Sequence, residues 1–183
     1  YPAYVFASED FYAEWKHVET LKAHLEPIDA VAIAVGSGVI NDTVKYVSYL
    51  LGRKYMCVGT AASMDGFTAY GSSITKDGNK QTFDCPAPFG FVLDSGIAAE
   101  APKELAASGY ADLIAKIPAA ADWMIADAVG SEKIDEFAWG LVQDGLKEAL
   151  ADPAAVRAGD VEKTQALADG LLMSGFAMQA IQS

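Results

Sequence analysis

The most constraining feature of this sequence is the alternation of short apolar runs with helical patterns in its first half. Residues 30–35 read AVAIAV, which is typical of a strand covered on both faces in a parallel sheet. GSG follows, and apolar residues at helical spacing then run to Leu51 before Gly52 ends the pattern. Residues 55–58 form the next apolar run. This order predicts a doubly wound α/β fold with a mostly parallel sheet.

The segments before and after residues 30–58 predict further strands and a helix. A strand-like run at residues 4–6 precedes an amphipathic helix over residues 9–25. Residues 72–84 alternate about Asp77-Gly78, a strong hairpin signal, and residues 89–93 predict one more strand. We therefore assign residues 1–97 to an α/β domain.

From Ala98 onward the composition shifts to Ala, Leu, Lys and Glu, which predicts an all-α domain over residues 98–183. Pro102 is placed to open its first helix. Later helices are expected over residues 111–128, 131–150 and 160–182. Pro118 lies inside the first of these and predicts a kink or a break there.

The composition of the chain limits the kinds of partner that it can bind. The chain has 183 residues, 52% of them hydrophobic, so it can bury a sizeable core. Its 25 acids outnumber its 13 bases, which argues against nucleic acid or an anionic membrane as partner. No apolar run reaches the roughly 20 residues that span a bilayer. These features predict a cytoplasmic protein with no membrane insertion and a small-molecule ligand, and they leave a homo-oligomer open.

Both ends of the sequence look cut. The chain has no initiator Met, and SGFAMQAIQS stops inside an apolar helical pattern without a stop signal. Cys57 and Cys85 are expected to be reduced packing cysteines, with a disulfide as the weaker alternative.

Gly36-Ser37-Gly38 stands where a strand meets the start of a helix, a position at which backbone N–H groups can approach a pyrophosphate. An ordinary tight turn explains the same residues equally well. The usual dinucleotide pattern is incomplete, because Asn41 takes the third glycine position and no acid follows about 20 residues later.

TAASMDGF, residues 60–67, follows the second buried strand and sets the single carboxylate of Asp65 among small residues. Ligands of open α/β folds bind at the carboxyl ends of parallel strands, where small side chains let a cofactor approach the backbone. A plain Asp-Gly turn is the alternative for Asp65 taken alone.

Several motifs in a consistent order carry a family resemblance. GSGVINDTVKY, TAASMDGF, GYADLIAK and ADW together resemble the sn-glycerol-1-phosphate dehydrogenase family. That family belongs to the superfamily of iron-dependent alcohol dehydrogenases, glycerol dehydrogenases and dehydroquinate synthases. The resemblance covers residues from about 30 to 125.

The resemblance implies a set of site residues. Asp65 is implied to contact the substrate, and Asp112 to ligate a metal and lie against the substrate. Two segments are implied to contact the cofactor, namely Gly38, Val39, Ile40, Asn41 and Asp42, and then Thr60, Ala61, Ala62 and Ser63.

The implied reaction is hydride transfer between NAD(P)H and dihydroxyacetone phosphate, giving sn-glycerol 1-phosphate. The implied cofactors are NAD(P) and a divalent metal, with zinc expected and nickel or iron left open.

The chain also departs from the family. No histidine follows Asp112, although the remaining metal ligands should be histidines, and His17 and His24 both precede the glycine turn. Either the chain ends before those ligands or the metal site is lost, so we expect no turnover by the chain as it stands. Gly59 replaces a family proline, and Ala69 replaces a cofactor-contacting serine for which Thr68 is the nearest substitute.

Lys45 and Lys116 are the candidates for binding the substrate phosphate, ahead of Arg53 and Lys54. Three other functions remain open at this stage. They are a glycerol dehydrogenase, a dehydroquinate-synthase-like enzyme, and a non-catalytic nucleotide-binding protein that kept the glycine turn.

Overall fold

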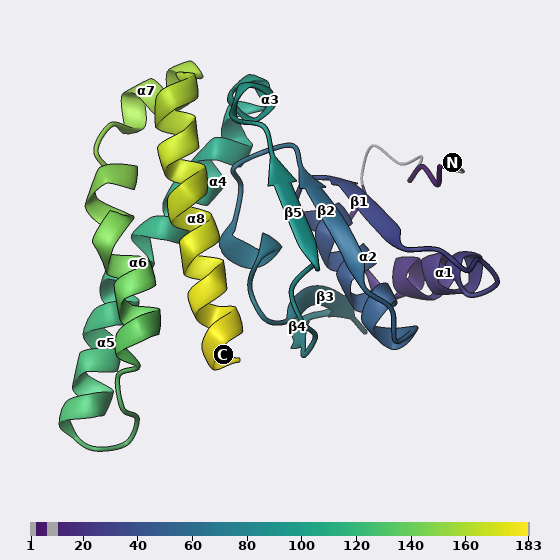
Figure 1. Cartoon of the computed structure of the whole chain (residues 1–183), viewed down its shortest axis with the longest axis horizontal. Helices are drawn as coiled ribbons and strands as arrows, with labels where there is room; N and C mark the ends of the chain where they lie inside the picture. The colour runs from purple at the N-terminus through teal and green to yellow at the C-terminus, as the bar shows by residue number, and fades with distance from the viewer. Residues whose placement is uncertain (1–2, 7–10, 183) are drawn as a thin grey trace.

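The computed structural model describes residues 3–6 and 11–182, and shows an α/β part followed by a group of helices (Figure 1). A parallel sheet of three strands has the order β1-β2-β5. Its strands are β1 (Ala32–Gly36), β2 (Tyr55–Gly59) and β5 (Gly90–Leu93). Helix α2 (Gly38–Leu50) crosses from β1 to β2, and α1 (Trp15–Leu25) packs against α2.

Among the residues that the structure describes, six helices follow β5: α3 (Ser95–Glu100), α4 (Lys103–Ile114), α5 (Lys116–Ala128), α6 (Glu136–Ala149), α7 (Pro153–Ala158) and α8 (Val161–Ile181). The long helix α8 contacts α3, α4, α6 and α7, and also the short 3₁₀ turn η1 (Asp65–Phe67). The expected fold class, an α/β part followed by helices, is confirmed. The domain boundary between residues 97 and 98 stays a prediction.

Aspartates set the starts of four helices after β5. In each, the carboxylate accepts a hydrogen bond from the backbone N–H three residues later, at a position where the helix itself offers no partner. The capping residues are Asp94, Asp135, Asp152 and Asp160. These caps explain why α6 begins at Glu136 rather than at the expected residue 131.

The expected helix over residues 111–128 is wrong in its extent. Helix α4 begins after Pro102 and runs to Ile114, and α5 begins at Lys116. Pro118 has no backbone N–H to donate to the carbonyl of Ile114, and its ring would clash with that carbonyl. The break that Pro118 predicted therefore occurs, and it separates Asp112 from Lys116.

Two N-terminal predictions also need correction. Residues 3–6 form no strand, and α1 begins at Trp15 rather than at residue 9. Residues 7–10 lie outside the described part of the chain.

The hairpin prediction is confirmed. β3 (Ser72–Lys76) pairs antiparallel with β4 (Asn79–Phe83) as a separate two-stranded sheet. The turn residues Asp77 and Gly78 both have positive φ, at 52° and 77°. A two-residue turn with two positive φ angles matches the twist of the strands that it joins.

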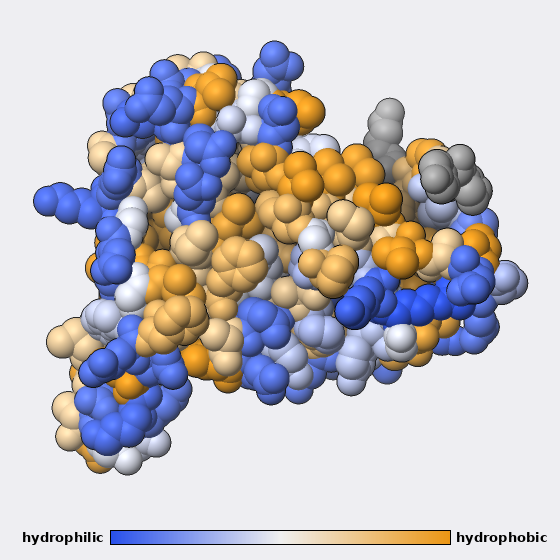
Figure 2. Space-filling model, in the orientation of Figure 1, coloured by the Kyte–Doolittle hydropathy of each residue, from blue (hydrophilic) through white to orange (hydrophobic). Residues whose placement is uncertain are grey.

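The expectation that β1 is covered on both faces is wrong for the described residues. Ala34 and Cys57 face α2 and are buried, but Ile33 and Val35 are 59% and 61% exposed. Val92 of β5 lies in register with Val35 through Val58 and is also exposed. Figure 2 shows apolar surface across this side of the molecule. We call the side formed by Ile33, Val35 and Val92 the open sheet face.

Most of the buried apolar residues in the described part of the chain belong to two clusters. One lies between α1, α2, the sheet and the hairpin and includes Val18, Val47 and Ile74. The other joins α4, α6 and α8 and includes Leu113 and Leu167. Within the described residues, no helix has both the length and the apolar character required for a membrane span.

Candidate functional site

A cleft of about 320 Å³ lies at the N-terminus of α2. Three elements that are far apart in sequence contribute residues to its lining, namely α2, the hairpin and α4. Its lining includes four of the residues implied to contact the cofactor: Gly38, Val39, Asp42 and Ser63. The hairpin adds Ser73, Thr75 and Lys80, and α4 adds Leu105 and Ser108.

The start of α2 leaves backbone donors available at this cleft. Ser37 is the N-cap, but its side chain makes no capping hydrogen bond. The first N–H groups of α2 therefore lack the side-chain partner that α3, α6, α7 and α8 have. Unpaired N–H groups at the positive end of a helix dipole favour an anion such as a diphosphate.

The other implied cofactor residues do not line the cleft. Asn41 is fully buried, and its amide bridges two other segments. Its Nδ2 donates to the carbonyl of Gly66 at 3.3 Å, and its Oδ1 accepts from the Tyr55 hydroxyl at 3.0 Å. The remaining members of the set that lie outside the lining are Ile40, Thr60, Ala61 and Ala62.

Asp65 and Asp112 meet, although they are 47 positions apart in sequence. The backbone N–H of Asp65 donates to Oδ2 of Asp112 at 2.8 Å. Helix α4 approaches this loop closely because Gly109, one turn before Asp112, lies against the carbonyl of Ala62, where a Cβ would collide. The loop that carries Asp65 also contributes Ser63 and Met64, which directly precede it, to the lining of the cleft.

Lys116 lies between the two carboxylates. Its Nζ is 2.5 Å from Oδ2 of Asp65 and 3.8 Å from Oδ1 of Asp112. Burial raises the pKa of Asp112, and the neighbouring Asp65 carboxylate raises that pKa further. The three side chains form a compact polar group in which one cation faces two acids.

Sequence reasoning missed Ser174. The Ser174 hydroxyl donates to Oδ2 of Asp65 at 2.8 Å, and both side chains are buried. The next residue, Gly175, lets α8 touch the loop, because a Cβ there would collide with Oγ1 of Thr68 and with the Asp65 carbonyl. No local signal could have identified Ser174, since it lies 109 positions from Asp65.

Lys45, one of the two candidates for binding the substrate phosphate, has no donor available for a phosphate in this structure. Lys45 is 1% exposed, and its ammonium donates to the carbonyls of Gly66 at 2.7 Å, Ala69 at 2.9 Å and Gly71 at 3.0 Å. An ammonium has three donors, so none remains for a phosphate.

The departures from the family pattern have structural reasons. A Cβ at Gly59 would lie 2.9 Å from the Phe91 ring, so this packing favours glycine over proline. Thr68 cannot replace the serine missing at Ala69 as a cofactor contact, because it is buried and its hydroxyl donates to the Leu172 carbonyl at 3.0 Å.

The described residues do not fit a complete metal site. None of their His, Cys, Asp and Glu side chains form a group of three or more that could hold an ion. His17 and His24 lie on α1, where their rings pack against Phe11 and Tyr4. Asp112 is the one metal ligand that the family resemblance implies in this chain, and three or four ligands are the usual requirement for zinc.

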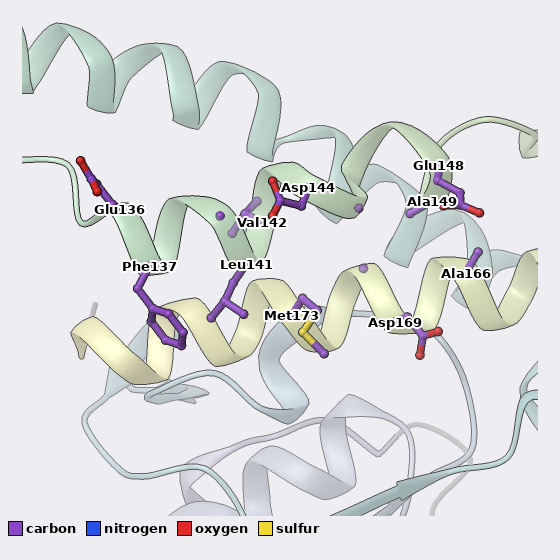
Figure 3. Close-up of a pocket in the computed structure, with 13 residues that line it drawn as sticks. Glu136, Phe137, Leu141, Val142, Asp144, Glu148, Ala149, Ala166, Asp169 and Met173 are labelled. Carbon is purple, nitrogen blue, oxygen red and sulfur yellow. The ribbon is translucent and has the colours of Figure 1, made fainter.

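A second, larger groove of about 600 Å³ lies between α6 and α8 (Figure 3). Phe137, Leu141 and Met173 line it together with the acids Glu136, Asp144, Glu148 and Asp169. None of the site residues expected from the sequence line this groove, so it lies apart from the candidate site.

Comparison with known proteins agrees with the sequence resemblance. Residues 3–102 match the family model described as iron-containing alcohol dehydrogenase. The chain is 34% identical over 151 residues to a glycerol-1-phosphate dehydrogenase [NAD(P)+] of Bacillus velezensis, which covers 82% of this chain and 38% of that protein. It is 36% identical over 168 residues to one of Methanocorpusculum labreanum, covering 91% and 46% of the two chains.

Solved structures share the fold. A probable glycerol dehydrogenase of Sinorhizobium meliloti aligns with a TM-score of 0.75 at 20% identity, over 92% of this chain and 51% of that one. An iron-containing alcohol dehydrogenase of Thermotoga maritima aligns with a TM-score of 0.70 at 16% identity, over 93% and 51%. The chain thus spans about half the length of these structures, and less than half of the two curated relatives.

Proposed function

Because the chain belongs to the iron-containing alcohol dehydrogenase family, we propose that it binds the cofactor and substrate of a metal-dependent, NAD(P)-linked dehydrogenase that interconverts dihydroxyacetone phosphate and sn-glycerol 1-phosphate. In that reaction a hydride passes from the reduced nicotinamide to the keto carbon, and a proton joins the keto oxygen. The names of the relatives at 34% and 36% identity support this substrate pair.

One observation carries the proposal. Ser63 and Met64 line the cleft at the N-terminus of α2 and directly precede Asp65 in sequence, and the Asp65 N–H in turn donates to Asp112. We assign the cleft to the NAD(P) diphosphate and its ribose side, and the Asp65–Asp112 pair to the substrate. Gly38, Val39, Asp42 and Ser63 would contact the cofactor directly, while Asn41 would hold the wall behind it.

Titration with NADH and NADPH, followed by their fluorescence, tests cofactor binding on this chain. A Cβ at Gly38 would collide with Sδ of Met64 at the cleft wall, so Gly38→Ala should weaken NADH binding about tenfold, or about 1.4 kcal/mol. Gly145→Ala is the matched control, because a Cβ at Gly145 meets open space. Failure of the unmodified chain to bind either nucleotide would refute the proposal.

Nuclear magnetic resonance separates the substrate classes. Dihydroxyacetone phosphate, added to the NADH complex, should shift the Asp65 and Asp112 amide resonances more than neutral dihydroxyacetone does. A larger shift with the neutral compound would favour a glycerol dehydrogenase instead. No shift with either compound would count against a substrate role for the pair.

We further propose that a divalent metal, with zinc as the expected ion, would take Asp112 as its one ligand from this chain. Within the described residues, no three His, Cys, Asp or Glu side chains form a group that could hold an ion. Zinc titrated calorimetrically should therefore bind no more tightly than about millimolar, equivalent to about 4 kcal/mol. The zinc-treated chain should not oxidise NADH with dihydroxyacetone phosphate, and turnover would contradict this assignment.

The same observation favours a second candidate, a non-catalytic nucleotide-binding protein. Its cleft would bind NADH, while the Asp65–Asp112 pair would bind neither dihydroxyacetone phosphate nor dihydroxyacetone. The nucleotide and ketone titrations together therefore distinguish the two candidates.

A further inference from the structure

Lys45 is a buried cation with no substrate-binding role left to it, and it connects α2 to the loop that carries Asp65. Its three acceptors, the carbonyls of Gly66, Ala69 and Gly71, all lie within six residues after Asp65. Placing a lysine at 1% exposure is costly, so contacts that satisfy all three donors have to offset its lost hydration.

The loop held by Lys45 has no regular structure after η1. The 3₁₀ turn Asp65–Phe67 is a single turn, and the chain then runs irregularly to β3. Carbonyl groups in such a segment lack ladder partners, and a buried carbonyl without a donor is unfavourable. Lys45 supplies the donors for three of them at one point.

A second side chain of α2 binds one of the same carbonyl groups. Nδ2 of Asn41, one helical turn before Lys45 on α2, also donates to the Gly66 carbonyl, at 3.3 Å. Burial lowers the pKa of Lys45, and the Asp42 carboxylate on the same helix acts in the opposite direction and raises that pKa. From the other side, Ser174 of α8 holds the Asp65 carboxylate at 2.8 Å.

We propose that Lys45 is the positioning residue of Asp65, fixing the Gly66–Gly71 backbone so that the Asp65 carboxylate and N–H face Asp112. Its value for substrate binding rests on the function proposed above. Lys45 does not itself line the cleft, and its ammonium donates to backbone carbonyls rather than to the Asp65 carboxylate, so we expect it to act through the backbone.

Amide hydrogen exchange, measured residue by residue by nuclear magnetic resonance, tests the proposal on the whole chain. The reporters are the N–H groups of Asp65, Thr68 and Gly71, which donate to Asp112, Asp65 and Cys85. Lys45→Met keeps the length and removes the charge and donors. It should speed exchange of these amides at least about tenfold while α8 amides change less than about twofold.

Lys54→Met is the matched control, because Lys54 is an exposed lysine near the start of β2 and should leave the reporters unchanged. A uniform rise in exchange across the chain would make Lys45 a contributor to global stability only and would overturn the proposal. Unchanged reporters in Lys45→Met would overturn it as well.

Two further measurements apply if the variant does not fold, or if it folds and can be titrated. If Lys45→Met does not fold, hydrogen exchange of the Lys45 ammonium is measured in the unmodified chain. That ammonium should give a ¹⁵N signal protected from exchange at neutral pH, and exchange as fast as that of the Lys54 ammonium would refute the contacts. In folded Lys45→Met, dihydroxyacetone phosphate should no longer shift the Asp65 amide, whereas Lys54→Met should respond normally. Failure of the unmodified chain to bind NADH would remove the proposed function but leave the exchange result standing.

Discussion

At the scale of single residues, burial decides what each polar group can do. Asp42 and Lys45 belong to one turn of α2, and both are buried, although Asp42 reaches the cleft. Burial raises the pKa of Asp42 to about 7, against the pull of the Lys45 charge and the Asn41 amide. Burial likewise lowers the pKa of Lys45. Charge at these two positions is therefore linked to folding.

Asp42→Asn should flatten the pH dependence of stability. Because the folded state raises the pKa of Asp42, its protonated form favours folding, and this contribution is complete below about pH 4 and lost as pH rises to about 7. The unmodified chain should lose up to about 1.4 kcal/mol per pH unit in this window through Asp42.

Urea unfolding of the two proteins between pH 4 and pH 8 measures that difference. Asp77→Asn serves as control and should follow the unmodified chain. Equal slopes for Asp42→Asn and the unmodified chain would show that Asp42 is not the linked group.

At the scale of elements, glycines set how closely helices approach the site loop. Gly109 lets α4 lie against Ala62, and Gly175 lets α8 lie against Thr68 and Asp65. These two contacts bring Asp112 of α4 and Ser174 of α8 to Asp65. Glycine inside a helix is intrinsically unfavourable, so its presence at both contacts is explained by the close approach.

Gly175→Ala should destabilise the chain by about 1–3 kcal/mol, because the new methyl group would overlap backbone and side-chain atoms of the loop. Gly145→Ala, in α6, should instead stabilise the chain by about 0.5–1 kcal/mol, since a Cβ at this position meets open space. Urea denaturation gives both values. A stabilising Gly175→Ala would mean that α8 does not press against the loop.

At the scale of the whole molecule, the sheet is covered unevenly. Helices α1 and α2 and the hairpin bury one side, while the open sheet face presents Ile33, Val35 and Val92 together (Figure 2). Adjacent exposed apolar side chains differ from scattered ones, because a contiguous patch favours association or binding of apolar molecules.

Val35→Glu should reduce the fluorescence of the apolar dye ANS bound to the chain and raise the concentration at which the chain self-associates. Its free energy of unfolding should change by no more than about 0.5 kcal/mol, because the side chain is already 61% exposed. Val161→Glu, at the half-exposed start of α8, is the control and should leave dye binding unchanged. Equal dye binding by both variants would argue against an accessible patch.

Local patterns in the sequence determined much of this protein. The alternation of apolar runs and helices predicted the order of elements, Asp77-Gly78 predicted the hairpin, and Pro118 predicted the break. These signals act through backbone sterics and hydrogen bonds between near neighbours, so they can be recognised in a single sequence. The motifs that contain Gly38, Asp65 and Asp112 likewise pointed to residues that the structure brings to one region.

Only the tertiary structure decided the rest. The pairing of Ser174 with Asp65, the capture of three carbonyls by Lys45 and the exposure of Val35 depend on which distant segments come together. Each is a balance between desolvation and contacts made across tens of positions, which no local pattern encodes. Lys45 shows this directly, because its residue type suggests a phosphate ligand while its burial leaves it no donor to offer.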